Sequence, residues 1–135
     1  GRIPKIYLNP ITFFIKQLFS HQIIPYLYFD FKFTKNLDVM GNAEVFDFNL
    51  SNKPREFLIL INKKQSCDEI LNTIAHELIH CKQFAYKELN PECTMWKKQR
   101  YNIFEYNHED LPWEQEAEEL SIRLVEKYCA LGRTR

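Results

Sequence analysis

The sequence lacks a surplus of either charge, because its 18 lysines and arginines balance its 18 aspartates and glutamates. General nucleic-acid binders usually carry a basic surplus, so the neutral total argues against that class. The sequence also lacks a long apolar run. Its longest, residues 57–61, falls far short of the ~20 residues that a membrane-spanning helix needs. We therefore expect neither nucleic acids nor membranes among the partners.

Paired cysteines are missing as well. The four cysteines include no C-x-x-C pair, which argues against a zinc site made of cysteines. A chain of 135 residues can bury a core without disulfides, so reduced thiols are expected. The N-terminus has no secretory signal pattern and begins with Gly1 instead of Met, which indicates a trimmed or processed chain. These features predict one domain over residues 1–135, monomeric, in a bacterial or host cytoplasm.

Hydrophobic periodicity of two kinds is present and predicts an α+β domain. Residues 11–20 have the pattern of a short amphipathic helix. Three strand-like runs follow, at residues 26–33, 43–50 and 56–62. Residues 36–42, which contain Gly41, are expected to form a turn between the first two strands. We expect a small, mostly antiparallel sheet with the third run as its central strand.

Two longer helices are predicted after the strands. Ser66 and Glu69 match the S-x-x-E capping box, in which both side chains accept hydrogen bonds from backbone N–H groups of the first turn. A helix should therefore cover residues 67–87. A last helix should run over residues 112–130, with Gly132 as its stop.

The first of these helices contains the motif H-E-x-x-H, formed by His76, Glu77 and His80. With about 100° of rotation per residue, the apolar residues occupy one half of the helix and both histidines occupy the other. The histidines lie one turn apart on one surface, so they face solvent or a second layer of structure rather than the core. The apolar half consists of Ile70, Leu71, Ile74, Ala75, Leu78 and Ile79.

The spacing of the two histidines suits a metal ion. Two imidazoles at positions i and i+4 of a helix can bind one zinc ion with little strain. Glu77 lies beside the pair, too far round the helix for a third ligand but near enough to reach a water on the metal, as a general base must. We therefore predict one Zn²⁺ ion held by His76 and His80, with Glu77 as the catalytic residue.

A catalytic zinc ion usually has three protein ligands and one open position. On the last helix, Glu114 falls within the apolar face, where a buried carboxylate needs a cation as its partner. Glu114 is therefore the first candidate for the third ligand. Glu116, on the flank of that face, is the alternative, and His108 is a weaker candidate for a third imidazole. If no metal binds, the two acids simply complement the helix dipole at an exposed first turn.

The residues ILNTIAHELIH and, further along, PWEQEAE resemble the zincin metallopeptidases. Within them they are most similar to the glutamate-type branch, whose second motif reads E-x-x-A-[N/D] or E-x-x-x-D. Glu114, Ala117 and Glu118 match that motif, with Glu118 in place of the usual Asn or Asp. The resemblance implies that Glu114 binds zinc, that Glu118 orients a ligand histidine, and that the fold is a zincin-like minimal metalloprotease domain.

The longer run HELIHCKQF…WKKQRY…LPWEQEAE is also similar to the small SprT-like peptidases of phages and bacteria. This resemblance covers roughly residues 43–125. Typical SprT-like proteins use a third histidine that this sequence does not show, which argues against a role in the repair of DNA–protein crosslinks.

These features together predict a zinc-dependent metallopeptidase that hydrolyses peptide bonds of a protein or peptide, with Glu77 taking the proton of the attacking water. The strand over residues 43–50 is the first candidate for an edge that holds the substrate in extended form. Three alternatives remain. They are another zinc amide hydrolase such as a peptide deformylase, a metal- or peptide-binding domain without catalysis, and an interaction domain with two surface histidines.

Overall fold

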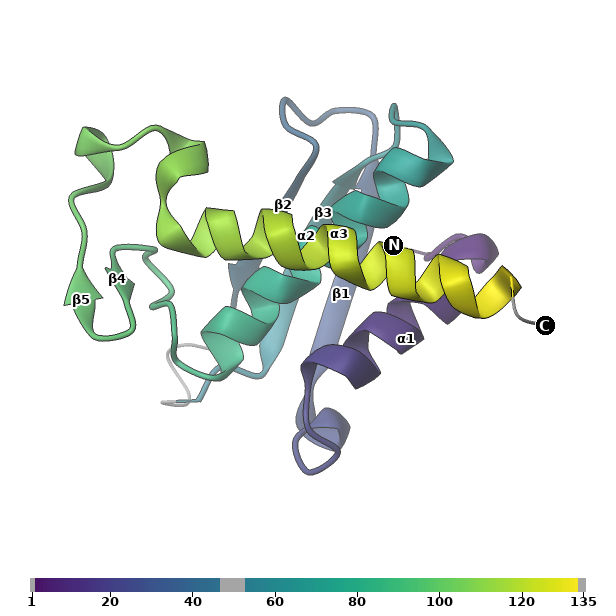
Figure 1. The fold of residues 1–135 in the computed structure, drawn as a ribbon, viewed down its shortest axis with the longest axis horizontal. Helices are drawn as coiled ribbons and strands as arrows, with labels where there is room; N and C mark the ends of the chain where they lie inside the picture. The colour runs from purple at the N-terminus through teal and green to yellow at the C-terminus, as the bar shows by residue number, and fades with distance from the viewer. Residues whose placement is uncertain (1, 47–52, 134–135) are drawn as a thin grey trace.

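The computed structural model of the protein describes residues 2–46 and 53–133, and Figure 1 shows it as a ribbon. In chain order, its main elements are the helix α1 (Leu8–Leu18), the strands β1 (Tyr28–Thr34), β2 (Gly41–Val45) and β3 (Glu56–Asn62), the helix α2 (Cys67–Ala85), the short strands β4 (Met95–Trp96) and β5 (Gln99–Arg100), and the helix α3 (Pro112–Arg133). The short 3₁₀ helices are η1 (Lys5–Tyr7), η2 (Ile24–Tyr26), η3 (Ile103–Glu105) and η4 (His108–Asp110). This is the α+β class that the periodicity predicted. None of the described helices combines the length and the apolar character needed to cross a membrane.

Three strands form the main sheet in the order β1–β3–β2. β3 is central, as its continuous apolar run predicted, and its residues Phe57, Ile59 and Ile61 are fully buried. β2 pairs with β3 in the antiparallel sense, with Gly41 opposite Ile61, whereas β1 runs parallel to β3. With the antiparallel β4–β5 pair, two of the three strand pairs in the described chain are antiparallel. Because the strand order is β1–β3–β2, β2 forms one edge of the main sheet.

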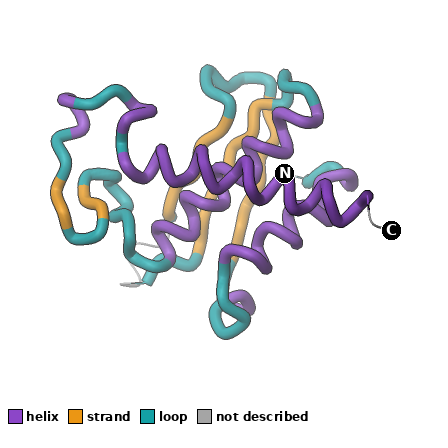
Figure 2. The backbone as a smooth tube through the Cα atoms, viewed as in Figure 1, coloured by secondary structure: helices purple, strands orange, loops and turns teal. Residues whose placement is uncertain are grey.

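The helices lie on one side of the sheet, as Figures 1 and 2 show. α2 packs against β2 and β3, and α3 crosses α2 on the side away from the sheet. α1 packs beside α2. Because α2 is covered by the sheet and by α3, even its polar residues His80 and Gln83 are buried, and both form hydrogen bonds with α3. The second layer that the histidines were expected to face is therefore α3.

The observed ends of the helices test the predicted start and stop signals. The capping box of α2 is present, since Ser66 Oγ accepts the Glu69 N–H at 3.2 Å and the Glu69 carboxylate accepts the Ser66 N–H at 2.9 Å. α1 begins before the predicted residue 11, because Pro10 is tolerated in a first turn, where N–H groups have no partner within the helix. The predicted stop at Gly132 is wrong. Gly132 does not adopt the left-handed conformation that ends many helices, and α3 continues to Arg133.

Gly41 was expected in a turn but is the first residue of β2. A Cβ atom at this position would lie 2.6 Å from Thr73 Cγ2 and 3.1 Å from Glu77 Cγ on α2. The glycine therefore permits a close approach between a strand and a helix, which is why the turn prediction was wrong. The predicted strand over residues 43–50 is observed up to Val45, and residues 47–50 lie outside the described residues.

Candidate metal centre

α2 and α3 bring together three of the side chains proposed as metal ligands. His76 Nε2 lies 3.1 Å from Glu114 Oε1, and His80 Nε2 lies 3.2 Å from the same oxygen. One ligand atom from each of the three residues lies within 4.8 Å of the other two. Two imidazole nitrogens and a carboxylate oxygen at these separations can hold a metal ion. Among the described residues, this is the one group of three or more histidine, cysteine or acidic side chains so placed.

The helices position these side chains through local geometry and packing. His76 and His80 are one turn apart on α2, and their ring centroids are 4.9 Å apart. Glu114 lies in the first turn of α3, next to the buried side chains of Leu111 and Trp113. These two apolar side chains anchor the start of α3 in the core. The Glu114 carboxylate is thereby held against the imidazoles.

The charges of the site are strongly coupled. Burial opposes protonation of His80, but the hydrogen bond and charge of Glu114, with the charge of Glu77, outweigh burial and raise the pKa of His80 to about 9. Burial also disfavours an ionised Glu114, yet the hydrogen bonds from His76 and His80 hold the pKa of Glu114 well below its ordinary value. Glu114 is therefore an anion that attracts cations, either a proton on the imidazoles or a metal ion.

Gln83 belongs to the site although the sequence did not indicate it. Its side chain is fully buried, and its Oε1 accepts a hydrogen bond from His80 Nδ1 at 2.8 Å. Its Nε2 donates to the Trp113 carbonyl and to Glu116 Oε1, both at 3.0 Å. With Nδ1 protonated against Gln83, the Nε2 atom of His80 is the nitrogen that can bind a metal.

The other candidate ligands take different places. Glu116, the alternative third ligand, faces Gln83 rather than the two histidines of α2. His108 Nε2 lies 3.2 Å from Glu114 Oε2, with a side chain that is 78% exposed, so it contacts the acid of the group from the solvent side. Glu118 Oε2 lies 3.8 Å from His76 Nδ1, beyond ordinary hydrogen-bond length. The orienting role that the resemblance implies for Glu118 stays a prediction.

Glu77 has an environment unlike that of Glu114. It is 7% exposed, and its carboxylate, for which no hydrogen bond is found within the described part of the chain, is not sealed in the core but lines the cleft. Burial raises the pKa of Glu77, and the imidazoles of His80 and His76 offset only part of that increase. Two neighbouring carboxyls therefore have opposite pKa shifts, which suits one of them for proton transfer and the other for charge binding.

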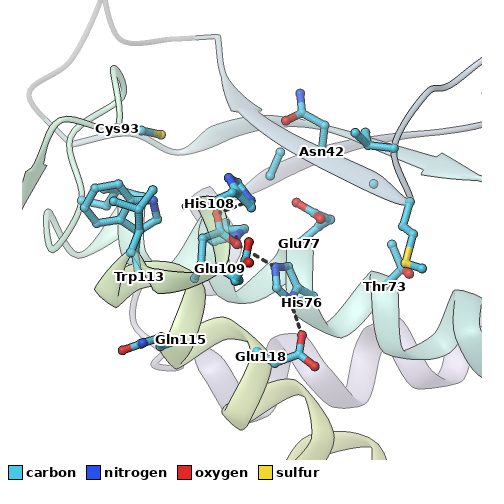
Figure 3. Close-up of a pocket in the computed structure, with 18 of the residues that line it drawn as sticks. Asn42, Thr73, His76, Glu77, Cys93, His108, Glu109, Trp113, Gln115 and Glu118 are labelled. Atoms are coloured by element: carbon cyan, nitrogen blue, oxygen red, sulfur yellow. Dashed lines mark hydrogen bonds and ion pairs between the residues drawn. The ribbon is translucent and has the colours of Figure 1, made fainter. Parts of the chain in front are cut away.

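A cleft of about 950 Å³ opens over these residues. Its walls are the start of β2, the middle of α2, η4 and the first two turns of α3. In Figure 3, Glu77 points to the side of α2 that faces β2, while His76 lies between α2 and α3. The site is thus accessible to a molecule that lies along β2.

Comparison of the chain with protein-family models, curated proteins and solved structures finds no match in any of the three. The function must therefore be argued from the geometry of the chain's own residues.

The cysteines take no part in this constellation. All four are free. Cys81 is fully buried on α2, and burial, with a contribution from the charge of Glu77, raises the pKa of its thiol. Cys93 lines the cleft, but burial raises its pKa to about 11. A thiol with such a pKa is protonated at neutral pH and is a poor nucleophile or metal ligand.

Proposed function

We propose that this protein is a zinc-dependent metallopeptidase of the zincin type, similar to the SprT-like peptidases, that acts on peptide bonds of a protein or peptide. One observation carries the proposal. The ligand atoms of His76, His80 and Glu114 converge within 4.8 Å in a cleft that Glu77 also lines. A metal-binding group beside an acid that lines the same cleft is what metal-assisted hydrolysis needs.

The set of donor atoms favours zinc. Zinc binds imidazole nitrogen and carboxylate oxygen, and catalytic zinc sites have three protein ligands and one open position. The hydrogen bond between Gln83 and His80 Nδ1 leaves the Nε2 atom of His80 for the metal. When bound, zinc supplies a Lewis acid that polarises a carbonyl oxygen and makes water more acidic.

Glu77 is the proposed general base. Burial raises the pKa of Glu77, so its carboxylate holds a proton more readily than that of an exposed glutamate. It takes a proton from the attacking water and later delivers it to the nitrogen of the leaving amine. Glu114 is unsuited to this task, because its contacts with the imidazoles keep the pKa of Glu114 low.

β2 is the proposed strand for substrate binding. One edge of β2 pairs with β3, and no other described strand pairs with the opposite edge. Asn42 and Ala43, near the start of β2, line the cleft together with Glu77. An extended peptide can add to such an edge through backbone hydrogen bonds, and its cleaved bond would then lie over α2.

Metal analysis tests the ligand set. The purified protein should contain one zinc ion per chain after zinc loading and removal of excess metal. Glu114→Ala should lose the ion, because it removes the carboxylate nearest to both imidazoles. Glu116→Ala is the matched control, an acid of the same helix turned toward Gln83. It should still bind one zinc ion per chain, with an affinity lowered only through the loss of its bond to Gln83. Loss of zinc in Glu116→Ala alone would reverse the assignment of the third ligand.

Peptide hydrolysis tests the role of Glu77. Glu77→Gln should keep its zinc and lose about 10²- to 10⁴-fold in kcat, the usual contribution of a general acid–base group. The rate is measured with an unfolded protein substrate and mass spectrometry of the products. Cleavage by Glu77→Gln at the parental rate would exclude the mechanism. Stoichiometric zinc without any hydrolysis by the parent would favour a metal- or peptide-binding domain, and activity on formyl-peptides alone would favour a deformylase.

A further inference from the structure

The residues that line the cleft at the metal centre can be assigned to its two ends, because α2 and α3 run in opposite directions beside it. His76 contacts Glu114 and, one turn later on α3, Glu118, whereas Gln83, about two turns after His76 on α2, bonds to Trp113, which precedes Glu114 on α3. Residues that precede His76 on α2 therefore share one end of the cleft with residues that follow Glu114 on α3. Residues that follow His80 share the other end with the residues that precede Glu114.

The two ends differ in chemistry. What we call the acidic end is formed by Asn72, Glu118 and Glu119, and the apolar end by Phe84, Leu89 and Trp113. The metal centre lies between them. A substrate that fills the cleft therefore meets Glu118 and Glu119 on one side of the reacting bond and mainly hydrocarbon on the other, where Glu109 on the exposed η4 is the one acid that lines the cleft.

The cleft carries an excess of acidic side chains, although the chain as a whole has none. The residues that line it include five glutamates and neither lysine nor arginine, while the whole chain has equal numbers of acidic and basic residues. Glu77 and Glu114 belong to the metal centre, and the two positive charges of a zinc ion would balance them. Glu119 pairs with Arg123 at 3.0 Å. Among the described residues, Glu109 and Glu118 have no lysine or arginine partner, and the Glu118 carboxylate contacts only His76, at 3.8 Å.

Glu118 is the better placed of these two. It lies on the regular helix α3, one turn after Glu114, whereas Glu109 lies on the exposed η4. Its side chain is 65% exposed, and its closest charged neighbour is His76 at 3.8 Å, too far for a hydrogen bond. The carboxylate of Glu77, 7% exposed, lines the same cleft (Figure 3). The Glu118 carboxylate is therefore exposed at the cleft and can meet a cationic group of a ligand.

We propose that the cleft selects polypeptide segments that carry a lysine or arginine side chain on one side of the cleaved bond, with Glu118 as the specificity-determining residue. This inference rests on the proposed peptidase function and names its substrate class. The ammonium or guanidinium group meets the Glu118 carboxylate at the acidic end, and an uncharged, bulky side chain occupies the apolar end. Complementary charge at the mouth of a cleft chiefly sets specificity and encounter rate.

Peptides that differ only in charge provide the test. A series with Lys, Gln or Glu at each position flanking the cleaved bond is offered to the zinc-loaded protein, and the products are quantified by mass spectrometry. For one of these flanking positions, the kcat/KM of the parent should be about tenfold higher for the lysine peptide than for the glutamate peptide. Glu118→Gln should bring this ratio close to one, and Glu118→Lys should reverse it. A ratio does not depend on how much of each variant holds zinc.

Glu126 supplies the matched control, since it is exposed on the same helix and does not line the cleft. Glu126→Lys changes the net charge as much as Glu118→Lys does, and it should leave the ratio unchanged. If the parent cleaves all three peptides equally, or if Glu118→Lys keeps the preference for lysine, the selectivity is refuted and the peptidase function is unaffected.

A binding measurement separates this inference from the proposed function. Zinc-loaded Glu77→Gln keeps the cleft, and its affinity for fluorescently labelled lysine and glutamate peptides is measured directly. If the parent hydrolyses nothing and the lysine peptide still binds about tenfold more tightly, the hydrolysis is refuted and the selectivity stands. Equal affinity for both peptides refutes the selectivity whether or not the parent is active.

Discussion

At the scale of single residues, the hydrogen bonds that join His80, Gln83 and Glu116 make a testable contribution to metal binding. Gln83→Leu leaves the buried His80 Nδ1 without its acceptor and the half-buried Glu116 without its donor. We expect the affinity for zinc to fall by about 10- to 100-fold, the usual effect of losing a partner of a ligand histidine. Competition with a chromophoric chelator measures the affinity, and circular dichroism shows whether the variant is folded.

A reciprocal substitution distinguishes orientation of His80 from simple packing. Gln83→Glu keeps an acceptor for His80 Nδ1 but sets two carboxylates against each other, so it should weaken zinc binding and the fold. Combining it with Glu116→Gln restores a donor opposite the new carboxylate, but the Trp113 carbonyl still lacks its donor, so part of the affinity should return. If the double variant binds zinc no more tightly than Gln83→Glu alone, the role of Gln83 in orienting the histidine is refuted.

The residue scale also shows which parts of the site can be predicted from a sequence. His76, Glu77 and His80 were found because their relation is fixed by one turn of one helix. Glu114 was found because a carboxylate in an apolar face needs a partner, and the structure places it at both imidazoles. Gln83 was missed although its contact with His80 spans only three residues, because the partners that fix its orientation, Trp113 and Glu116, lie 30 and 33 residues away in the chain.

At the scale of elements, the contact between β2 and α2 depends on Gly41. In Gly41→Ala the new methyl would lie 2.6 Å from Thr73 Cγ2. Thr73 cannot easily turn away, because its hydroxyl bonds to Gln65 and to the Glu69 carbonyl, both at 2.9 Å. We expect Gly41→Ala to lower the free energy of unfolding by about 1–3 kcal/mol, as measured by urea denaturation.

The matched second substitution is Thr73→Ser, which removes the methyl that clashes and keeps the hydroxyl with its two hydrogen bonds. Added to Gly41→Ala, it should recover a large part of the lost free energy of unfolding. The effects of the two substitutions should then deviate from additivity by about 1 kcal/mol. Strictly additive effects would show that the contact between strand and helix is looser than the structure has it.

The elements themselves were predictable where the signal is local. The apolar run of β3 and the capping box of α2 are contained in a few adjacent residues, and both elements begin where the sequence placed them. The position of Gly41 was predicted wrongly, because a glycine that relieves a contact with a distant helix has the same local signature as one in a turn. The pairing of β1 parallel to β3 likewise depends on the path of the whole chain rather than on either strand.

At the scale of the whole molecule, the proposed metal ion would join two layers of the fold. Its ligands come from α2, which packs on the sheet, and from α3, which covers α2. A ligand that binds only the folded chain stabilises it by about 2.7 kcal/mol at a free concentration of 100 times its Kd. For a domain of this size we expect zinc to raise Tm by about 10 °C over the protein treated with EDTA. Equal Tm values with zinc and with EDTA would argue against a metal centre between the layers.

The size of this stabilisation should increase with pH, and the direction follows from His80. Contacts with Glu114 and Glu77, against the opposing effect of burial, raise the pKa of His80 from its ordinary value of 6.5 to about 9. Its proton therefore stabilises the metal-free fold fully below pH 6.5, and this contribution is lost as the pH rises to about 9. Zinc must displace that proton, so metal affinity rises over the same interval. Thermal denaturation with zinc or EDTA between these pH values should show a widening difference in Tm. Glu114→Gln, which removes both a metal ligand and a main cause of the raised pKa, should show neither the zinc effect nor its dependence on pH.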